Sequence, residues 1–421
     1  MIPRMSGTHF LSGRHIVVAG AGMSGLSFAI ALRKLWPESV TPPRITIFER
    51  DTEADAEGRQ GYSLSLAGYD ETGGLVALRD LGLLDDILPH AIAGLEGTGC
   101  FKVWDSNWSE MMSVRFRPAK GLPSSGIRVA RRDLRRTLLA AVVDEIRWGT
   151  ACVSAAKIKD GKVNIQLAGS NVRPAESTLQ CDFLVVADGA NSKIRASLRP
   201  DDVLQFAGAT QMVGIASFPD GNPAQLRDNW GMQISRGEGV SCFYSPVDHN
   251  NVLWALSFLE QHERPRGEHN SQEATQALLE EARERGAKPL GSQFQTIVDA
   301  TKNPKDVACL SARDKKPFRH DLDEAAIVFI GDSNHAVSPF AGYGASLALK
   351  DGWDLSKALI SSPTAKKAIQ MYDAVSFSRA SKILNSSRWR IKYGHGTGLR
   401  YLFFRTILTV GGYLLWITGR D

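Results

Sequence analysis

The chain opens with an apolar run, a glycine-rich turn and a stretch of helix-forming residues. Residues 16–19 are apolar throughout, which is typical of a parallel strand buried on both faces. Residues 24–35 are rich in helix formers, and three prolines between residues 36 and 44 mark the loop that follows. Residues 44–48 alternate and include β-branched side chains, so a second strand is predicted there. The pattern therefore predicts a strand–helix–strand unit.

Apolar periodicity predicts further helices and two more buried strands. Leucines recur at helical spacing across 72–88, and 131–143 also has a helical pattern. Short apolar runs at 183–186 and 326–330 have the length of buried parallel strands. Each of these two runs is followed by an acidic residue beside a glycine.

The pattern changes between about residues 206 and 309. Strand-like segments such as 211–218 and 252–258 alternate with polar turns, and a charged helix is predicted over 272–285. We interpret this region as a mixed-sheet module inserted between parts of the first domain. The predicted fold class is therefore α/β, a Rossmann-like domain with an inserted mixed β-sheet domain and C-terminal helices.

Composition narrows the class of protein. The 421 residues are 43% hydrophobic and 23% charged, as in ordinary globular enzymes large enough for two domains. The net charge of +5 gives no reason to expect a nucleic-acid partner. Five scattered cysteines without a C-x-x-C pair argue against a dithiol active site. We expect no secretory signal, and no stretch reaches the roughly 18 apolar residues of a membrane-spanning helix.

The first candidate binding motif is a G-x-G-x-x-G between the first predicted strand and helix. Gly20 permits the tight turn, Gly22 lets a pyrophosphate approach the backbone, and Gly25 allows close packing of helix and strand. The phosphate charge then lies at the positive end of the helix. Glu49 ends the second strand, where its carboxylate can accept hydrogen bonds from ribose hydroxyls. Its negative charge disfavours a 2′-phosphate, so the motif favours FAD or NAD over NADP.

Two further motifs follow the other buried strands. Asp188-Gly189 follows the strand at 183–186, and Gly331-Asp332 follows the strand at 326–330. Ligands of open α/β sheets bind beyond the carboxyl ends of the strands, so we expect the three motifs to converge on one elongated ligand. A carboxylate that merely caps a turn is the alternative for Asp188.

This ordered set of motifs resembles the single-component, group A flavoprotein monooxygenases of the aromatic hydroxylase type. The resemblance extends from residue 16 to about 359, and the combination of three motifs is specific to that superfamily. It implies a FAD-binding domain of the glutathione-reductase type with an inserted substrate domain. The predicted FAD-binding domain comprises 1–90, 126–205 and 308–360, the substrate-binding domain comprises 91–125 and 206–307, and a C-terminal helical region covers 361–421.

The resemblance also implies roles for single residues. Glu49 would bind the adenosine ribose, Arg50 would lie by the adenine, and Asp188 would contact the cofactor near the pyrophosphate or NAD(P)H. Asp332 would bind the ribityl hydroxyls, and Gly342 and Gly344 would direct backbone N–H groups at the pyrimidine edge of the flavin. The complete implied set is Gly20, Gly22, Gly25, Glu49, Arg50, Arg131, Asp188, Gly189, Gly331, Asp332, Pro339, Gly342 and Gly344.

The implied activity is that of a monooxygenase. NAD(P)H would reduce FAD, and O₂ would give a flavin C4a-hydroperoxide that hydroxylates or epoxidises a small aromatic, polyketide or alkaloid-like substrate, as in secondary metabolism. The sequence has no evident metal-ligand cluster, so a cofactor is expected to carry the redox chemistry. No second G-x-G-x-x-G has strand–helix context, so NAD(P)H is expected to bind transiently. A reductase or halogenase on the same fold, and a non-catalytic FAD-stabilised protein, are the alternatives.

The sequence does not identify a catalytic base. Arg59, just before the strand-like segment 60–66, and Tyr62, within it, are candidates to face the flavin. His335 is a third candidate because an unperturbed histidine titrates near neutrality, although a structural role near FAD is the favoured interpretation.

Two apolar features have both a structural and a functional interpretation. Four aromatic side chains of the inserted module either line a substrate pocket or belong to the core; they are Phe243, Tyr244, Trp254 and Phe258. Residues 399–417 are apolar and aromatic around Arg405, with basic residues upstream. This helix either lies on a membrane surface or, as we favour, packs on the protein. A cytoplasmic location is expected, with peripheral membrane contact as the open alternative.

Overall fold

The computed structural model describes residues 9–58, 62–95, 99–173, 176–265, 272–303 and 307–417. The strands are β1 (His15–Ala19), β2 (Arg44–Phe48), β3 (Ser63–Ala67), β4 (Ala91–Ala93), β5 (Phe101–Trp104), β6 (Glu110–Val114), β7 (Gly126–Ala130), β8 (Glu145–Arg147), β9 (Ala151–Lys157), β10 (Val163–Ala168), β11 (Thr178–Cys181), β12 (Phe183–Val186), β13 (Gln205–Ser217), β14 (Trp230–Ile234), β15 (Val240–Pro246), β16 (Asn251–Leu259), β17 (Ala308–Asp314) and β18 (Ile327–Phe329). The α-helices are α1 (Met23–Leu35), α2 (Glu53–Gly58), α3 (Gly74–Leu81), α4 (Leu84–Ile87), α5 (Arg131–Ala141), α6 (Lys193–Leu198), α7 (Gln272–Asp299), α8 (Asp332–His335), α9 (Gly344–Ser361), α10 (Ala365–Gly394) and α11 (Gly398–Ile417).

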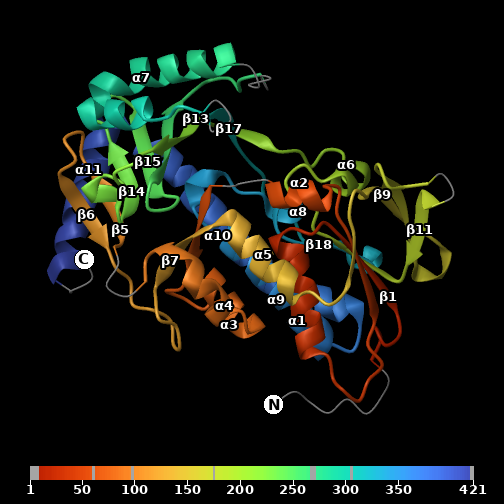
Figure 1. The fold of residues 1–421 in the computed structure, drawn as a ribbon. Coiled ribbons are helices and arrows are strands. Elements are labelled where there is room, and N and C mark those ends of the chain that lie inside the picture. The colour runs from red at the N-terminus through yellow and green to blue at the C-terminus, as the bar shows by residue number, and fades with distance from the viewer. Residues whose placement is uncertain are drawn as a thin grey trace.

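A five-stranded parallel sheet carries the three motifs. Its strand order is β18-β12-β1-β2-β8, and its central strands pair in register, with Val18 opposite both Val185 and Ile47. Helix α1 packs on α9 so closely that a Cβ at Gly352 would lie 2.5 Å from the backbone nitrogen of Phe28. The long helices α1, α5, α9 and α10 run through the middle of the molecule (Figure 1). The predicted Rossmann-like α/β fold is confirmed.

A seven-stranded mixed sheet forms the second body of the molecule, in the order β17-β13-β16-β15-β14-β5-β6. Helix α7 lies across one face of this sheet, at the top of Figure 1. Tyr244, Trp254 and Phe258 are buried on that face with Phe294 of α7, so these three aromatic residues belong to the core. Phe243 is only partly buried and, because side chains alternate along a strand, points to the opposite face.

Two strands lie on the other side of the predicted domain boundaries. Residues 308–314 were predicted to belong to the FAD-binding domain, but β17 pairs with β13 and so continues the seven-stranded sheet. Residues 91–93 were predicted to belong to the substrate domain, but β4 pairs with β7 in a three-stranded sheet that also contains β3. The hydrogen bonding of single strands, which composition does not reveal, decides both cases.

Two helices differ in extent from the prediction, and each has a break at a glycine. The helix predicted over 72–88 ends at Leu81, where Gly82 has a φ of +84° and forms a left-handed C-cap, and α4 follows. The helix predicted over 272–285 extends to Asp299, with a break at Gly291, whose φ is +79°. In both cases the positive φ suits glycine, and the apolar spacing alone does not reveal the break.

Helix α11 packs on β6 and leaves much of its apolar surface exposed. Leu408 is buried with Val103 and Ile234. No helix in the described part of the chain is long and apolar enough to cross a membrane. The exposed apolar side chains of α11 are Leu399, Leu402, Phe403, Ile407, Val410, Tyr413, Leu414, Trp416 and Ile417.

Candidate cofactor and substrate site

The carboxyl ends of four neighbouring parallel strands meet at one edge of the five-stranded sheet, which we call the strand-end edge. The chain there remains hydrogen-bonded from strand to strand. Gly20 N donates to Phe48 O at 2.7 Å, Ala187 N donates to Ala19 O at 2.8 Å, and Ile330 N donates to Val186 O at 2.9 Å. These bonds bring together the residues that follow β2, β1, β12 and β18.

The G-x-G-x-x-G turn has two crowded glycines and one open glycine. At Gly20, which has a φ of +110°, a Cβ would lie 2.4 Å from Ala187 O. At Gly25 a Cβ would lie 2.1 Å from Gly20 O. At Gly22, the N-cap of α1, the nearest described atom would be Ala187 O at 4.0 Å, and no side chain caps the helix within the described ranges. Gly20 and Gly25 are therefore required by the fold, whereas Gly22 leaves space for a ligand at a positive helix end.

Glu49 follows β2 and is buried at the same edge. Its Oε2 accepts hydrogen bonds from Ala21 N at 3.0 Å and from Arg135 Nη2 at 3.3 Å, and its Oε1 accepts one from Asp51 N. The carboxylate is thus fixed in orientation beside the Gly22 turn. Two thirds of the Arg50 side chain is exposed, and its Nε pairs with Asp51 at 3.6 Å.

Asp188 caps the turn that leads into α6. Its Oδ2 accepts a hydrogen bond from Lys193 N at 3.0 Å, and Gly189 beside it has a φ of +85°. Burial raises the pKa of this carboxyl, and its Oδ1 has no hydrogen-bond partner in the described residues. Asp188 therefore has the structural role of a turn cap, and its buried Oδ1 is left without a partner among the described residues.

Gly331 and Asp332 form the turn between β18 and α8. Gly331 has a φ of +59°, and a Cβ there would meet Ser24 Oγ of α1 at 2.8 Å. The Asp332 carboxyl reaches solvent, yet the protein around it reduces its solvation and raises its pKa, while the charges of His335 and Arg131 lower it. Within the described ranges no hydrogen bond engages this carboxylate, so it is available to a ligand.

Residues 339–344 form a tight loop before α9, which we call the flavin loop after its predicted role. Pro339 begins a 3₁₀ turn (Pro339–Ala341), and Gly342 follows with a φ of +61°. A Cβ at Gly342 would meet no described atom within 4 Å. Helix α9 begins at Gly344 without a side-chain cap from any described residue, so its first N–H groups are free to bind a negative group.

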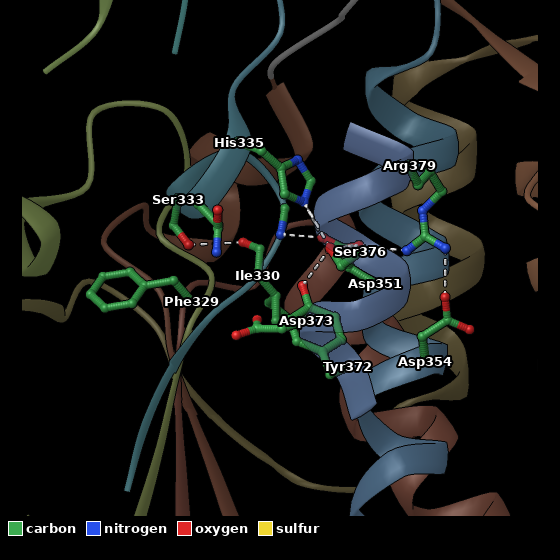
Figure 2. Close-up of polar contacts among 12 residues, drawn as sticks. Phe329, Ile330, Ser333, His335, Asp351, Asp354, Tyr372, Asp373, Ser376 and Arg379 are labelled. Atoms are coloured by element: carbon green, nitrogen blue, oxygen red, sulfur yellow. Dashed lines mark hydrogen bonds and ion pairs between the residues drawn. The ribbon is translucent and has the colours of Figure 1, made fainter. Parts of the chain in front are cut away.

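His335 belongs to a buried polar network between α8, α9 and α10 (Figure 2). Its Nε2 lies 2.5 Å from Oδ2 of Asp351, which is completely buried. The same Asp351 accepts hydrogen bonds from Gly331 N and from Arg379 of α10. Burial alone would raise the pKa of Asp351, but His335, and after it Arg379 and the Gly331 backbone, hold this pKa far below its usual range. These contacts favour the structural interpretation of His335.

The remaining catalytic candidates are Arg59 and Tyr62. Arg59 lies outside the described residues. The Tyr62 side chain is 52% exposed, although its carbonyl accepts a hydrogen bond from Arg131 N at 3.2 Å. The described residues contain no cluster that could hold a metal ion. A hollow of about 530 Å³ lies among surface loops around Asn222 and His249, away from the motif residues.

Sequence reasoning missed two arginines of this site. Arg135 lies one helical turn after Arg131 on α5, a spacing that could have indicated a common face. The charge of Arg131 lowers the pKa of Asp332, and Arg135 forms an ion pair with Glu49. Helix α5 therefore places one positive charge near each carboxylate. Arg390 of α10 donates to the carbonyls of Phe340 and Ala341 in the flavin loop. No local signal in the sequence could have identified Arg390, because its partners lie about 50 residues away.

Comparison with known proteins agrees with this geometry. The model of the FAD binding domain family matches residues 14–386. Monooxygenase cfoF of Aspergillus candidus is 41% identical over 399 residues, which cover 94% of each chain. Zeaxanthin epoxidase of Solanum lycopersicum is 27% identical over 81% of this chain, which spans about half (47%) of that longer protein. Klebsiella pneumoniae HpxO in complex with FAD and uric acid has the same fold, with a TM-score of 0.76 at 18% identity, covering 98% of this chain and 97% of that one.

The chain belongs to the FAD-binding family of group A flavoprotein monooxygenases. It is an FAD-dependent monooxygenase that acts on a small organic molecule by hydroxylation or epoxidation. The residues present fit FAD: the α1 and α9 N-termini are open to negative groups, and Asp332 offers a free carboxylate.

Proposed function

We propose that the strand-end edge and the flavin loop hold FAD in an extended form, and that the substrate lies between the flavin loop and the seven-stranded sheet. FAD reduced by NAD(P)H would supply the electrons for O₂ activation and transfer of one oxygen atom to an aromatic, polyketide or alkaloid-like molecule. NAD(P)H would bind transiently, as expected for a chain with one dinucleotide motif.

The protein's contribution is to bind, orient and stabilise charge. The Gly22 turn and the α1 N-terminus would take the pyrophosphate, and the fixed Glu49 carboxylate would accept the ribose hydroxyls. Asp332 would accept the ribityl hydroxyls. The free N–H groups at the start of α9 would stabilise negative charge at the pyrimidine edge without adding a group that titrates.

One observation carries this assignment of residues. The uncapped α1 N-terminus and one unpartnered carboxylate, both within the described residues, lie at the same sheet edge as a buried, oriented glutamate, and α9 begins without a side-chain cap at the flavin loop. A dinucleotide needs positive ends for its phosphates and acceptors for its hydroxyls, and this edge supplies both.

The test begins with the purified protein. We expect the absorbance spectrum of bound oxidised flavin, oxidation of NAD(P)H coupled to O₂ uptake, and a product that carries one atom from isotopically labelled O₂. A reductase on the same fold would oxidise NAD(P)H with its substrate and without O₂ uptake, and a non-catalytic protein would do neither. Either result would overturn the proposal.

A peripheral membrane contact through α11 is a separate part of the proposal. Leu399, Phe403 and Trp416 are each more than half exposed, and the exposed Arg400 and Arg405 lie on the same helix. Aromatic and basic side chains on one interfacial helix favour the surface of an anionic bilayer. Co-sedimentation with vesicles containing anionic lipid, lost on Phe403→Ser with Trp416→Ser, would support the contact, and equal recovery of both proteins in the supernatant would exclude it.

A further inference from the structure

Arg128 is a buried arginine that has only neutral partners. It lies in the middle of β7, and its side chain is 4% exposed. Its Nε donates to Ser245 Oγ at 2.9 Å, its Nη1 donates to Ser65 Oγ at 2.6 Å, and its Nη2 donates to both the carbonyl and the hydroxyl of Ser63 at 2.7 Å. The guanidinium also lies over the ring of Phe243, 5.4 Å from its centroid.

This charge differs from the other buried arginines of the described chain. Arg135 pairs with Glu49, Arg379 pairs with Asp351 and Asp354, and Arg195 lies close to Asp202. No described carboxylate pairs with Arg128, and burial alone lowers its pKa to about 9. A buried cation without a counter-charge is costly, so its presence calls for a group that the protein itself does not supply.

The position of Arg128 relates it to the flavin loop. Arg128 is opposite Ser65 in the β3–β7 pair, so both side chains lie on the same face of that sheet. Ala67, two residues further along β3, is on this face as well and packs against Ala341 and Tyr343 of the flavin loop. One strand repeat of roughly 7 Å thus separates the Arg128 position from the contact with the flavin loop.

The seven-stranded sheet also contacts Arg128. Phe243 and Ser245 of β15, which contact Arg128, point away from the face that α7 covers. Ser241 on the same face lies within hydrogen-bonding distance, 3.2 Å, of His395 Nε2, and the His395 ring contacts Phe340 of the flavin loop. The β3–β7 sheet therefore contacts the flavin loop directly, and the seven-stranded sheet is linked to the same loop through His395.

We propose that Arg128 binds an acidic group of the substrate, a carboxylate or an ionised phenol or enol, and so selects acidic aromatic molecules over neutral ones. The inference rests on the proposed function, since the ligand is the molecule to be oxygenated. The serine contacts hold the guanidinium in place and use four of its five N–H donors, which leaves one N–H of Nη1 and the positive charge for an oxygen of the acid. A hydrogen bond to a charged group favours an acid over its neutral isostere by about tenfold or more.

The experiment compares matched acids and amides on the FAD-loaded protein. Dissociation constants for benzoate and benzamide, and for salicylate and salicylamide, are measured through the change in flavin absorbance. We expect each acid to bind at least tenfold more tightly than its amide. Equal affinities, or no measurable binding of either acid, would overturn the inference.

Variants then assign the preference to Arg128. Arg128→Met should reduce the acid-to-amide ratio to about 1, and Arg128→Lys should keep part of it because the positive charge remains without the fixed geometry of the guanidinium. Arg285→Gln on α7, at the far face of the sheet, is the control and should leave the ratio unchanged. A ratio that survives in the Met variant, or that is unchanged in the Lys variant, would show that Arg128 does not contact the ligand.

Stability separates this role from that of a structural clamp. Removal of a buried cation that lacks a counter-charge should leave the melting temperature of Arg128→Met unchanged or raised, since Ser63 and Ser245 still hydrogen-bond each other. If Arg128 had only a structural role, the melting temperature of Arg128→Met would instead fall by several degrees and the acid preference would remain. If the Met variant does not fold, the Lys variant decides by its ratio. NAD(P)H oxidation and O₂ uptake without ligand are measured on the same samples, so failure of the proposed function is recognised separately.

Discussion

The imidazole Nε2 of His335 lies 2.5 Å from Oδ2 of Asp351, and this contact joins the turn after β18 to the helices that cover it (Figure 2). Asp351 also accepts a hydrogen bond from Gly331 N at 2.8 Å, one residue before the carboxylate proposed to hold the ribityl chain. The network thus fixes the backbone on which Asp332 stands. His335 therefore stabilises the turn that carries Asp332. Its Nε2 is hydrogen-bonded to Asp351 and is not free for proton transfer to a substrate.

Substitution of Asp351 should therefore destabilise the whole protein. Asp351→Asn removes the charge that Arg379 and His335 face in a buried site, and breaking such a network costs about 3–5 kcal/mol. The pKa of Asp351 is lowered in the folded protein, so its contribution is present above the pKa of the unfolded chain and is lost as pH falls through the folded pKa. Denaturant unfolding at several pH values should show the difference from wild type shrinking on acidification.

Asp354→Asn is the control for this measurement. Asp354 also binds Arg379, at 2.6 Å, but it is less buried and its loss leaves the Asp351 contact intact. A smaller loss of unfolding free energy is expected. Equal losses in the two variants would contradict the central role of Asp351.

Two glycines of the same motif should respond to alanine in opposite ways. A Cβ at Gly20 would lie 2.4 Å from a carbonyl oxygen at a φ of +110°, so Gly20→Ala should cost about 1–3 kcal/mol of stability. A Cβ at Gly22 meets open space in the described structure, so Gly22→Ala should fold normally and lose FAD because the methyl group occupies the pyrophosphate position. Melting of the FAD-free proteins and FAD titration measure the two effects. Retention of FAD by a folded Gly22→Ala protein would refute the pyrophosphate assignment.

The sequence allowed prediction of those features that depend on neighbours along the chain. The apolar runs that became β1, β2, β12 and β18 end at the predicted motifs, because strand length and turn glycines are local properties. The Tyr244 and Trp254 side chains could not be assigned to the core or to a pocket, since strand alternation gives two faces and not which face α7 covers.

Features that depend on distant partners were beyond prediction. Arg128 has an ordinary strand sequence around it, and its lack of a carboxylate partner in the described structure becomes evident only when β3 and β15 are placed beside it. Arg135 resembles any helical arginine until Glu49 is found at its end. Packing between residues far apart in the sequence determines the surroundings of both arginines, and the pattern of apolar residues does not predict such packing.

The two residues of the Glu-Arg pair after β2 should differ in importance. Glu49→Gln keeps an acceptor beside the Gly22 turn and loses the charge that would hold the ribose hydroxyls. The dissociation constant of FAD should therefore increase about tenfold or more. Arg50→Gln alters a side chain that is mostly exposed and should change the affinity little. Fluorescence titration of FAD into the FAD-free proteins gives both constants. The reverse order of effects would show that the adenine contact of Arg50 dominates.

The Asp332 carboxylate should lower the stability of the FAD-free protein and strengthen the binding of FAD. Its pKa is raised in the folded protein, so the folded state holds the proton more readily than the unfolded chain does. Stability of the FAD-free protein therefore falls as pH rises from the unfolded pKa to the folded one, and the penalty remains above the folded pKa. Asp332→Asn removes the charge, so the FAD-free variant should melt at a higher temperature than wild type at pH 7.

The same variant should bind FAD about tenfold more weakly or worse, because a neutral amide is a weaker acceptor than a carboxylate for the ribityl hydroxyls. Wild-type affinity should also decline as pH falls through the raised pKa of Asp332, and the decline attributable to this group should be absent from the variant. Asp85→Asn on α4, an exposed position, controls for the change in net charge and should alter neither property. A variant that melts lower while it retains full FAD affinity would mean that the Asp332 carboxylate stabilises the fold and does not face the cofactor.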